Sequence, residues 1–242
     1  MGYNTINVEP GSTTALGVQF ENVANAEAGI PIKSLLSYAN PTGQNKPDSI
    51  NCDKILVYTG ADWVKYYYYK KNLTATPYWV LSTDTTYQEI KDDVTLKAGQ
   101  CFFFYRANNA KSTTAVTLAG GVAPLAKPQA YTVAPGSTTA MAWPWPESLK
   151  IKDITKYYEN PTGQNKPDSI NCDKVLVYTG SDWIKYYYYK KNLTATPYWV
   201  LSTDTTYQEI KDDVKIDCGS GFFFYRANNA KGDTIISFDR TK

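Results

Sequence analysis

Histidine is absent from the 242 residues of this chain, and several sequence motifs of enzymes are absent with it. Without histidine there is no Ser-His-Asp or Cys-His catalysis, no histidine zinc site and no general base of the usual kind near neutral pH. The four cysteines form no C-x-x-C pair, and neither G-x-x-x-x-G-K-[ST] nor G-x-G-x-x-G occurs. We therefore expect a protein that is not an enzyme and that uses no cofactor or metal.

Acidic side chains are the remaining candidates for catalysis or metal binding. A glycosidase needs two carboxylates about 5 to 10 Å apart across a cleft, which the spacing of these acids does not predict. Oxygen ligands for calcium are present, but they match no EF-hand pattern, and we interpret the acids as surface residues and turn caps. The residues considered for catalysis are Glu89, Asp92 and Asp93 with their copies Glu209, Asp212 and Asp213, and those considered for calcium are Asp48, Asn51, Asp53 and Asp84.

Long apolar runs and an excess of charge are lacking as well. No segment approaches the roughly 20 apolar residues that cross a bilayer, so we expect no membrane insertion. The 25 basic residues nearly balance the 23 acidic ones and are scattered along the chain, which is not the pattern of a protein that binds nucleic acid. No signal peptide is visible, and Met1-Gly2 leads directly into the strand-like YNTINV, so we expect a leader peptide to have been removed.

What the sequence does contain is a long internal repeat. Residues 40–94 align without gaps on residues 160–214, and only three of the 55 positions differ. A period of 120 residues is longer than a solenoid repeat and matches a whole domain with its own core. We predict two tandem homologous domains, at residues 1–123 and 130–242, joined by a short proline-containing linker at residues 124–129.

The cysteines are placed unequally in the two copies. Cys52 and Cys172 are equivalent, whereas Cys101 aligns with Gly221 and Cys218 aligns with Ala98, so that each copy keeps one cysteine near its FFFY segment. This compensation predicts two disulfides, Cys52 to Cys101 and Cys172 to Cys218, and an oxidising compartment. The alternative is that the four residues are buried thiols.

The composition is typical of strands, because tyrosine and threonine are frequent and the apolar segments are short. We predict an all-β fold with two antiparallel β-sandwich or barrel domains of about seven to eight strands each. In the second copy the strands are expected at residues 130–133, 141–145, 149–154, 174–179, 183–190, 198–202, 221–226 and 234–239, with the first copy matching and closing at residues 116–120.

The strongest local pattern is the hairpin DKVLVYTGSDWIKYYYYK at residues 173–190, which repeats near residue 60. A two-residue turn at Gly180-Ser181 pairs Tyr178 with Trp183, and alternation then puts the aliphatic residues on a core face. The other face carries aromatic rings interleaved with lysine. We predict that this face binds a partner, or that parts of the same domain cover it. Its residues are Tyr58, Trp63, Lys65, Tyr67 and Tyr69 in the first copy and Tyr178, Trp183, Lys185, Tyr187 and Tyr189 in the second.

The order of the segments resembles that of a loosely defined class of bacterial secreted all-β modules. The residues that carry the resemblance are the opening PGSTTALGVQF, the hairpin that ends in aromatics, the tyrosine-tryptophan strand, and glycine followed by an aromatic strand at residues 99–104 and 219–224. Such modules are parts of cell-surface or extracellular assemblies. The resemblance therefore implies a secreted or cell-surface location, and it implies no catalytic residue.

Two functions remain as hypotheses. The first is a structural, self-associating extracellular protein, such as a fibre, pilus-like or surface-layer subunit, because the copies are near-identical while their terminal segments, which would be edge strands, have diverged. The second is a carbohydrate-binding or adhesive module with one aromatic platform per domain, built from Trp63 and Tyr67 and from Trp183 and Tyr187. The expected partners are accordingly further copies of the chain or a glycan.

Overall fold

A computed structural model of the protein describes residues 2–46, 49–72, 74–122, 129–166, 169–192 and 194–239. Strands make up 42% of the chain and helices 6%, and the strands form several antiparallel sheets, so the predicted all-β character is confirmed. None of the described sheets closes into a barrel. The part of the chain that is described also has no helix that is both long enough and apolar enough to cross a membrane.

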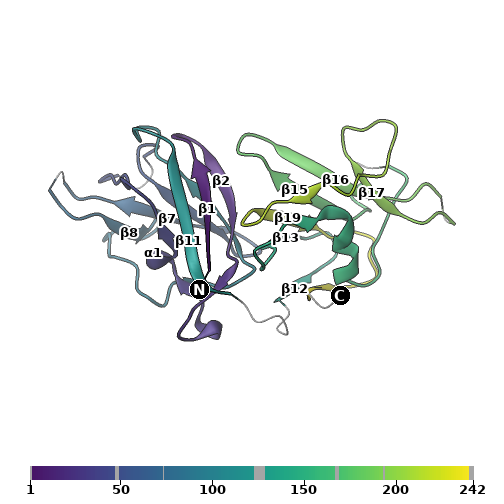
Figure 1. Ribbon diagram of the computed structural model, residues 1–242, viewed down its shortest axis with the longest axis horizontal. Helices are drawn as coiled ribbons and strands as arrows, with labels where there is room; N and C mark the ends of the chain where they lie inside the picture. The colour runs from purple at the N-terminus through teal and green to yellow at the C-terminus, as the bar shows by residue number, and fades with distance from the viewer. Residues whose placement is uncertain are drawn as a thin grey trace.

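The two halves of the chain contain corresponding strands (Figure 1). The first half contains β1 (Gly2–Val8), β2 (Thr13–Gly17), β3 (Phe20–Glu21), η1 (Ala26–Ala28), β4 (Ile30–Pro31), α1 (Ile32–Leu35), β5 (Leu36–Ser37), β6 (Lys54–Tyr58), β7 (Trp63–Tyr69), β8 (Tyr78–Leu81), β9 (Thr95–Leu96), β10 (Cys101–Tyr105) and β11 (Thr114–Val122). The second half contains β12 (Gln129–Val133), β13 (Thr138–Ala142), β14 (Leu149–Lys150), η2 (Ile151–Tyr157), β15 (Lys174–Tyr178), β16 (Trp183–Tyr189), β17 (Tyr198–Leu201), β18 (Lys215–Ile216), β19 (Gly221–Tyr225) and β20 (Thr234–Phe238).

Each half is built around a five-stranded sheet with the same strand order. The order is β2-β10-β6-β7-β8 in the first half and β13-β19-β15-β16-β17 in the second. The division into two domains stays a prediction. Of the predicted linker, residues 124–128 lie outside the described residues, and Gln129 is the first residue of β12.

The predicted hairpin register is present in both halves. Tyr178 pairs with Trp183 and Val175 with Tyr186, as expected for the two-residue turn, in which Gly180 has a φ of 96°. Val175 and Tyr186 lie in the core of the second half. Ile184 was expected there too but is 38% exposed, because the pairing of β16 with β17 begins only at Tyr186 and leaves the turn end of the hairpin uncovered.

Two predicted strands of the second half are partly wrong. The strand expected at residues 141–145 lies at Thr138–Ala142. Residues 149–154 were expected to form a strand, but the strand ends at Lys150 and the 3₁₀ helix η2 follows. The apolar residues Ile151, Ile154 and Tyr157 are spaced three apart, which matches the period of a 3₁₀ helix and puts all three on its buried face. The three-residue spacing of these apolar residues therefore indicated the helix, although a segment this short is easily taken for a strand.

A buried ion pair ties the sheet of each half to the loop that precedes it. Arg106 is 1% exposed and donates to both oxygens of Asp53, at 3.0 and 2.8 Å, and to the carbonyl oxygen of Asn40 at 3.0 Å. Asp53 also accepts hydrogen bonds from the backbone of Thr42 at 2.7 Å and from the Tyr38 hydroxyl at 3.0 Å. Burial, together with the Asp53 carboxylate beside it, holds the pKa of Tyr38 well above its usual value.

The second half repeats this arrangement. Arg226 donates to Asp173 at 2.9 Å, and Tyr158 donates to the same carboxylate at 3.1 Å. A charge this deeply buried is tolerated only where an opposite charge pairs with it, and removal of that partner is strongly destabilising. These two pairs therefore fix the loops that begin at Tyr38 and Tyr158 onto their sheets.

Substitution of Asp53 tests this interpretation. Asp53→Ala leaves the Arg106 guanidinium buried without its counter-ion, so we expect the free energy of unfolding to fall by about 3 to 5 kcal/mol. Asp62→Ala, in the exposed hairpin turn, is the matched control and should change it by no more than about 0.5 kcal/mol. Chemical denaturation measures both. Equal effects of the two substitutions would contradict a structural role for the ion pair.

Candidate interaction surfaces

The aromatic residues near the hairpin turns lie between the two halves. We call this contact the aromatic seam, and its residues are Tyr58, Trp63 and Phe103 from the first half and Tyr178, Trp183 and Phe223 from the second. In Figure 1 the two five-stranded sheets meet near the middle of the molecule, where β2 and β10 contact β13 and β19. This part of the aromatic face therefore packs on the other half of the same chain, whereas the sequence had indicated an outside partner or cover from the same domain.

The seam follows from strand alternation in the FFFY segments. Phe102 and Phe104 point into the core of the first half, so Phe103 between them points to the opposite face of the sheet. There the ring centroids of Phe103 and Phe223 lie 6.1 Å apart. Neither residue was among the predicted site residues, although the alternation within FFFY was a signal that could have identified them.

The tryptophans complete the seam symmetrically. The Trp63 ring lies 5.3 Å from Phe103 and 6.1 Å from Phe223, and the Trp183 ring lies 5.3 Å from Phe223 and 6.2 Å from Phe103. These tilted and edge-to-face arrangements are the favourable ones for aromatic pairs. Trp63 and Trp183 are still 40% and 37% exposed, so each ring is only partly covered.

The other predicted residues of the aromatic face are not in the seam. Tyr67 and Tyr69 are 2% and 7% exposed and pack with Cys52 and Val80, and Tyr187 and Tyr189 are buried in the equivalent cluster. Lys65 and Lys185 are exposed. Because Tyr67 and Tyr187 are buried, they form no open platform with Trp63 and Trp183. Near the turn this face packs on the other half, and farther along the strands it is covered within its own half.

The predicted disulfides are not formed, and all four cysteines, which lie in the described part of the chain, are thiols. Cys101 begins β10, whereas Cys52 lies beyond the residue that pairs with Tyr105 at the other end of that strand. Cys101 and Tyr105 are four residues apart, which separates them by about 13 Å along a strand. The Cα atoms of a disulfide lie within about 7 Å.

The second predicted bridge fails for the same reason. Lys174 pairs with Tyr225, so Cys172 lies near the end of β19, whereas Cys218 precedes the start of that strand. Cys218 instead accepts a hydrogen bond from Gln19 of the first half, at 3.2 Å. The similar distance of Cys101 and Cys218 from FFFY was therefore misread: both residues lie where the halves meet.

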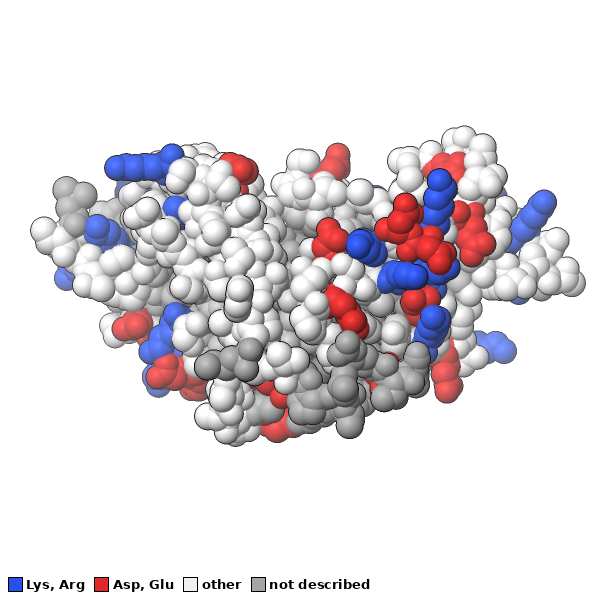
Figure 2. Space-filling model, in the orientation of Figure 1, with Lys and Arg blue, Asp and Glu red and all other residues white. Residues whose placement is uncertain are grey.

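The strand β1 lies at the edge of its sheet in the part of the chain that the structure describes, and its Asn4 side chain donates to the carbonyl oxygen of Cys218 at 3.3 Å. β11 is its only strand partner among the described residues. Its sequence GYNTINV contains no charge and no proline, and its outward residues Tyr3, Thr5 and Asn7 are exposed, Tyr3 by 79%. The outward residues of β11 are uncharged as well, and Figure 2 shows that the region of this face where β1 and β11 lie has few charged side chains. Edge strands of soluble proteins are usually protected by charges, prolines or bulges.

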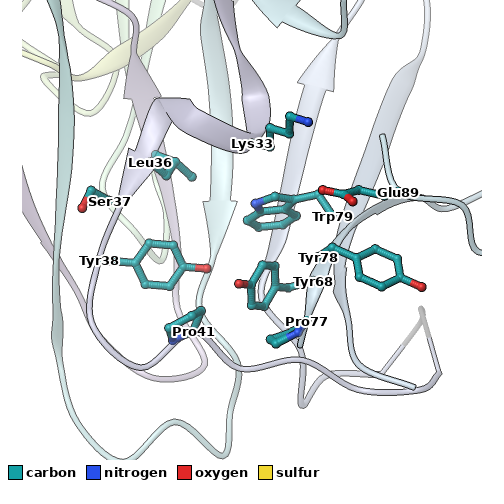
Figure 3. A pocket seen from close by; sticks show the side chains of 10 residues that line it. All are labelled: Lys33, Leu36, Ser37, Tyr38, Pro41, Tyr68, Pro77, Tyr78, Trp79 and Glu89. Atoms are coloured by element: carbon teal, nitrogen blue, oxygen red, sulfur yellow. The ribbon is translucent and has the colours of Figure 1, made fainter. Parts of the chain in front are cut away.

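An aromatic cavity of about 340 Å³ lies on the first half (Figure 3). Figure 3 shows the hydroxyls of Tyr38 and Tyr68 directed toward each other, with the Trp79 indole above them and Lys33 and Glu89 toward the same side of the opening. Burial raises the pKa of Tyr68 above its usual value, so its hydroxyl stays protonated at neutral pH. Rings beside hydrogen-bonding groups suit a ligand that has both apolar and polar faces.

The acidic residues considered for chemistry are dispersed. Glu89 lines the cavity, whereas Asp92 pairs with Lys33 at 2.8 Å. Asp212 contacts Lys152, and this ion pair holds the pKa of the Asp212 carboxyl below its usual value. Asp48 lies outside the described residues. In the described part of the chain no cluster of three or more acidic or cysteine residues has the geometry of a metal site.

Two of the calcium candidates have structural contacts instead. Asp53 is used by the ion pair with Arg106, and Asp84 accepts hydrogen bonds from Thr86 and from the backbone of Gln88 at 2.7 Å. These bonds lower the pKa of Asp84. Asp84 thus stabilises a turn.

Comparison of the chain with models of protein families, with curated proteins and with solved structures gives no match.

Counting thiols tests the corrected assignment of the cysteines. In denaturant without reductant we expect all four to react with a thiol reagent, and prior reduction should not change that number. In the native protein Cys101 should react slowly, because burial raises the pKa of its thiol to about 12 and the thiolate is the reactive form. If reduction were needed to expose thiols, the disulfides would be present after all.

Proposed function

We propose that this chain is a non-enzymatic structural protein that assembles with copies of itself outside the cell, as a fibre, pilus-like or surface-layer subunit. The observation that carries the proposal is the uncharged edge strand β1. An extended segment of another molecule can add to such an edge through backbone hydrogen bonds. The aromatic seam supports the same function, because it joins the two halves into a unit in which β1 still lies at a sheet edge.

The proposal includes two tandem homologous β-sandwich domains. In the first half the five-stranded sheet and the sheet of β1 and β11 share one core, to which Val8, Leu16, Phe102 and Val116 contribute. In the second half β12 pairs with β20, and Val133 and Ile236 share a core with Phe222 of the five-stranded sheet. Two sheets around one core in each half support a sandwich of the predicted size.

The extracellular location depends on a different observation from the assembly. The reduced thiols remove the argument for an oxidising compartment that the disulfides had provided. What supports secretion is the resemblance of the segment order to secreted modules. Assembly and location are therefore separate parts of the proposal.

Self-assembly can be tested at the β1 edge. We expect the purified chain to form higher-order species as its concentration rises, visible by light scattering and electron microscopy. Tyr3→Lys adds a charge beside this edge and should weaken association without changing the melting temperature, since Tyr3 is exposed. Ala61→Lys, in the exposed hairpin turn, is the matched control. A chain that stays monomeric at high concentration in varied salt and pH would contradict the proposal.

The aromatic cavity favours a second candidate function, carbohydrate binding. Tyr38 and Tyr68 are half-buried and offer ring surface that suits a pyranose face, whereas Trp79, 5% exposed, forms the floor of the cavity. Glu89 and Lys33 offer hydrogen-bonding groups.

Lys152 occupies the place of Lys33 in the second half and contacts the equivalent aspartate, Asp212. The segment that follows it there is the 3₁₀ helix η2, which contacts β17, and Tyr188 is buried. The two halves would therefore differ in this site, in contrast to the equivalent platforms expected from the sequence.

A glycan array tests the second candidate, with binding expected for a limited set of sugars. Tyr68→Ala should weaken that binding by about tenfold, the effect of losing one stacking contact. Tyr188→Ala changes the equivalent tyrosine of the second half and should reduce stability in a similar way while keeping the binding. An array without signals, or equal losses in both variants, would rule out a site in this cavity.

A further inference from the structure

The contact between the halves is related by an approximate two-fold axis. Phe103 and Phe223 occupy equivalent positions and contact each other. The Tyr58 ring lies 5.8 Å from Phe223, and the Tyr178 ring lies 5.5 Å from Phe103. Two-fold contacts of this kind are self-complementary, which is how homodimers form.

The backbone repeats the symmetry. The amide of Gly17 donates to the carbonyl oxygen of Gly219 at 2.6 Å, and the amide of Ala142 donates to that of Gly99 at 2.7 Å. Gly17 corresponds to Ala142, and Gly99 corresponds to Gly219. If the two faces were identical, each half would therefore fit a copy of itself as well as it fits the other half.

The faces differ where they approach most closely. Gly17 faces Ala142, and a Cβ added to Gly17 would lie 2.5 Å from the Cβ of Ala142. Cys101 faces Gly221, and a Cβ added to Gly221 would lie 3.0 Å from the Cβ of Cys101 and closer still to its Sγ. At both points a side chain on one half occupies space that a glycine leaves on the other.

A buried polar contact adds a third difference. Gln19 is fully buried and donates to the carbonyl oxygen of Trp145 at 2.7 Å, and Pro144 stands at the position of Gln19 in the second half. Proline has no side-chain amide, so only the first half can make this bond. A buried amide that lost its acceptor would destabilise a mismatched pair.

We propose that the aromatic seam is a docking surface with a fixed pairing rule. The face of a first half fits the face of a second half, in the same chain or in a second copy of it. Two first halves, or two second halves, do not fit each other. A pair of first halves would place Cys101 against Cys101 and leave a gap between two Gly17 residues. A pair of second halves would place Ala142 against Ala142 and leave a gap between two Gly221 residues. Each wrong pair combines a steric clash with a void, which is a means of specificity against unwanted partners.

This inference does not depend on assembly through β1. A chain that never forms higher-order species would end the proposed function and leave the pairing rule intact. If the rule failed instead, same-half pairs would form whether or not the β1 edge assembles.

The test uses the whole chain with a protease site inserted within residues 124–128. After folding and cleavage, native mass spectrometry should find complexes of one first half with one second half. Mixing with isotope-labelled cleaved protein should exchange partners only between opposite halves. Same-half pairs at the random ratio, or halves that separate without pairing, would overturn the proposal.

Two variants of the cleavable chain sharpen the result. Cys101→Gly with Ala142→Gly makes both faces glycine at the contact points, and same-half pairs should then increase by about tenfold or more. The four-fold exchange Gly17→Ala, Cys101→Gly, Ala142→Gly and Gly221→Cys moves the side chains to the opposite halves and should restore opposite-half pairing. If the first variant gained no same-half pairs, the steric part of the rule would be wrong.

Measurements on the uncut chain keep the proposal testable if cleavage unfolds the halves. Under mild oxidation Gly221→Cys should form a bridge with Cys101 within one chain, detectable by peptide mapping, whereas Ala61→Cys in the exposed turn should not. In the unmodified chain oxidation should give no Cys101–Cys101 dimer, because that bridge requires two first halves face to face. A missing bridge in Gly221→Cys, or a Cys101–Cys101 dimer, would contradict the inference.

Discussion

The buried ion pair between Arg106 and Asp53, with its copy between Arg226 and Asp173, is the interaction on which the arrangement of each half depends. A guanidinium and a carboxylate without solvent are stable only when they are paired and hydrogen-bonded. Here the two Nη atoms of Arg106 and both oxygens of Asp53 have partners, whereas the Arg106 Nε has none among the described residues. Asp53 therefore fixes the loop that begins at Tyr38, the start of β6 and the end of β10 at once. With these segments fixed on one side of the sheet, the opposite face near the hairpin turn is left for other contacts.

That opposite face places a constraint on the seam residues of both copies that their cores do not. A core tolerates many substitutions of similar volume, so folding does not require near-identity over 55 positions. A two-fold seam adds a stronger constraint, because a residue such as Phe103 must fit the surface that its own equivalent presents. Two facing positions of the seam can then differ only if their side chains are complementary in size. Cys101 and Gly221 are such a pair, because the larger side chain faces the glycine.

The seam and the β1 edge differ in the groups that they present: the seam consists of aromatic rings, and the edge of backbone hydrogen-bonding groups. Aromatic rings, which would otherwise expose apolar surface, are partly covered by the other half. The hydrogen-bonding groups on the outer side of β1 have no strand partner among the described residues and lie in a region with few charges. For the proposed assembly, backbone addition at β1 is therefore the better route, because the aromatic face near the hairpin turns already packs on the other half.

The sequence by itself determined the all-β class, the repeat and the register of the hairpins, because these follow from short-range rules: strand alternation, turn chemistry at Gly180, and alignment of the chain with itself. The disulfide prediction was wrong because the shared proximity of Cys101 and Cys218 to FFFY does not tell which residues the sheet register brings together. Cys101 begins β10, and Cys52 lies beyond the other end of that strand. The tertiary structure alone decided which aromatic rings are buried in their own half and which meet the other half. That choice depends on how two sheets approach each other, and no local pattern around Trp63 or Tyr67 encodes it.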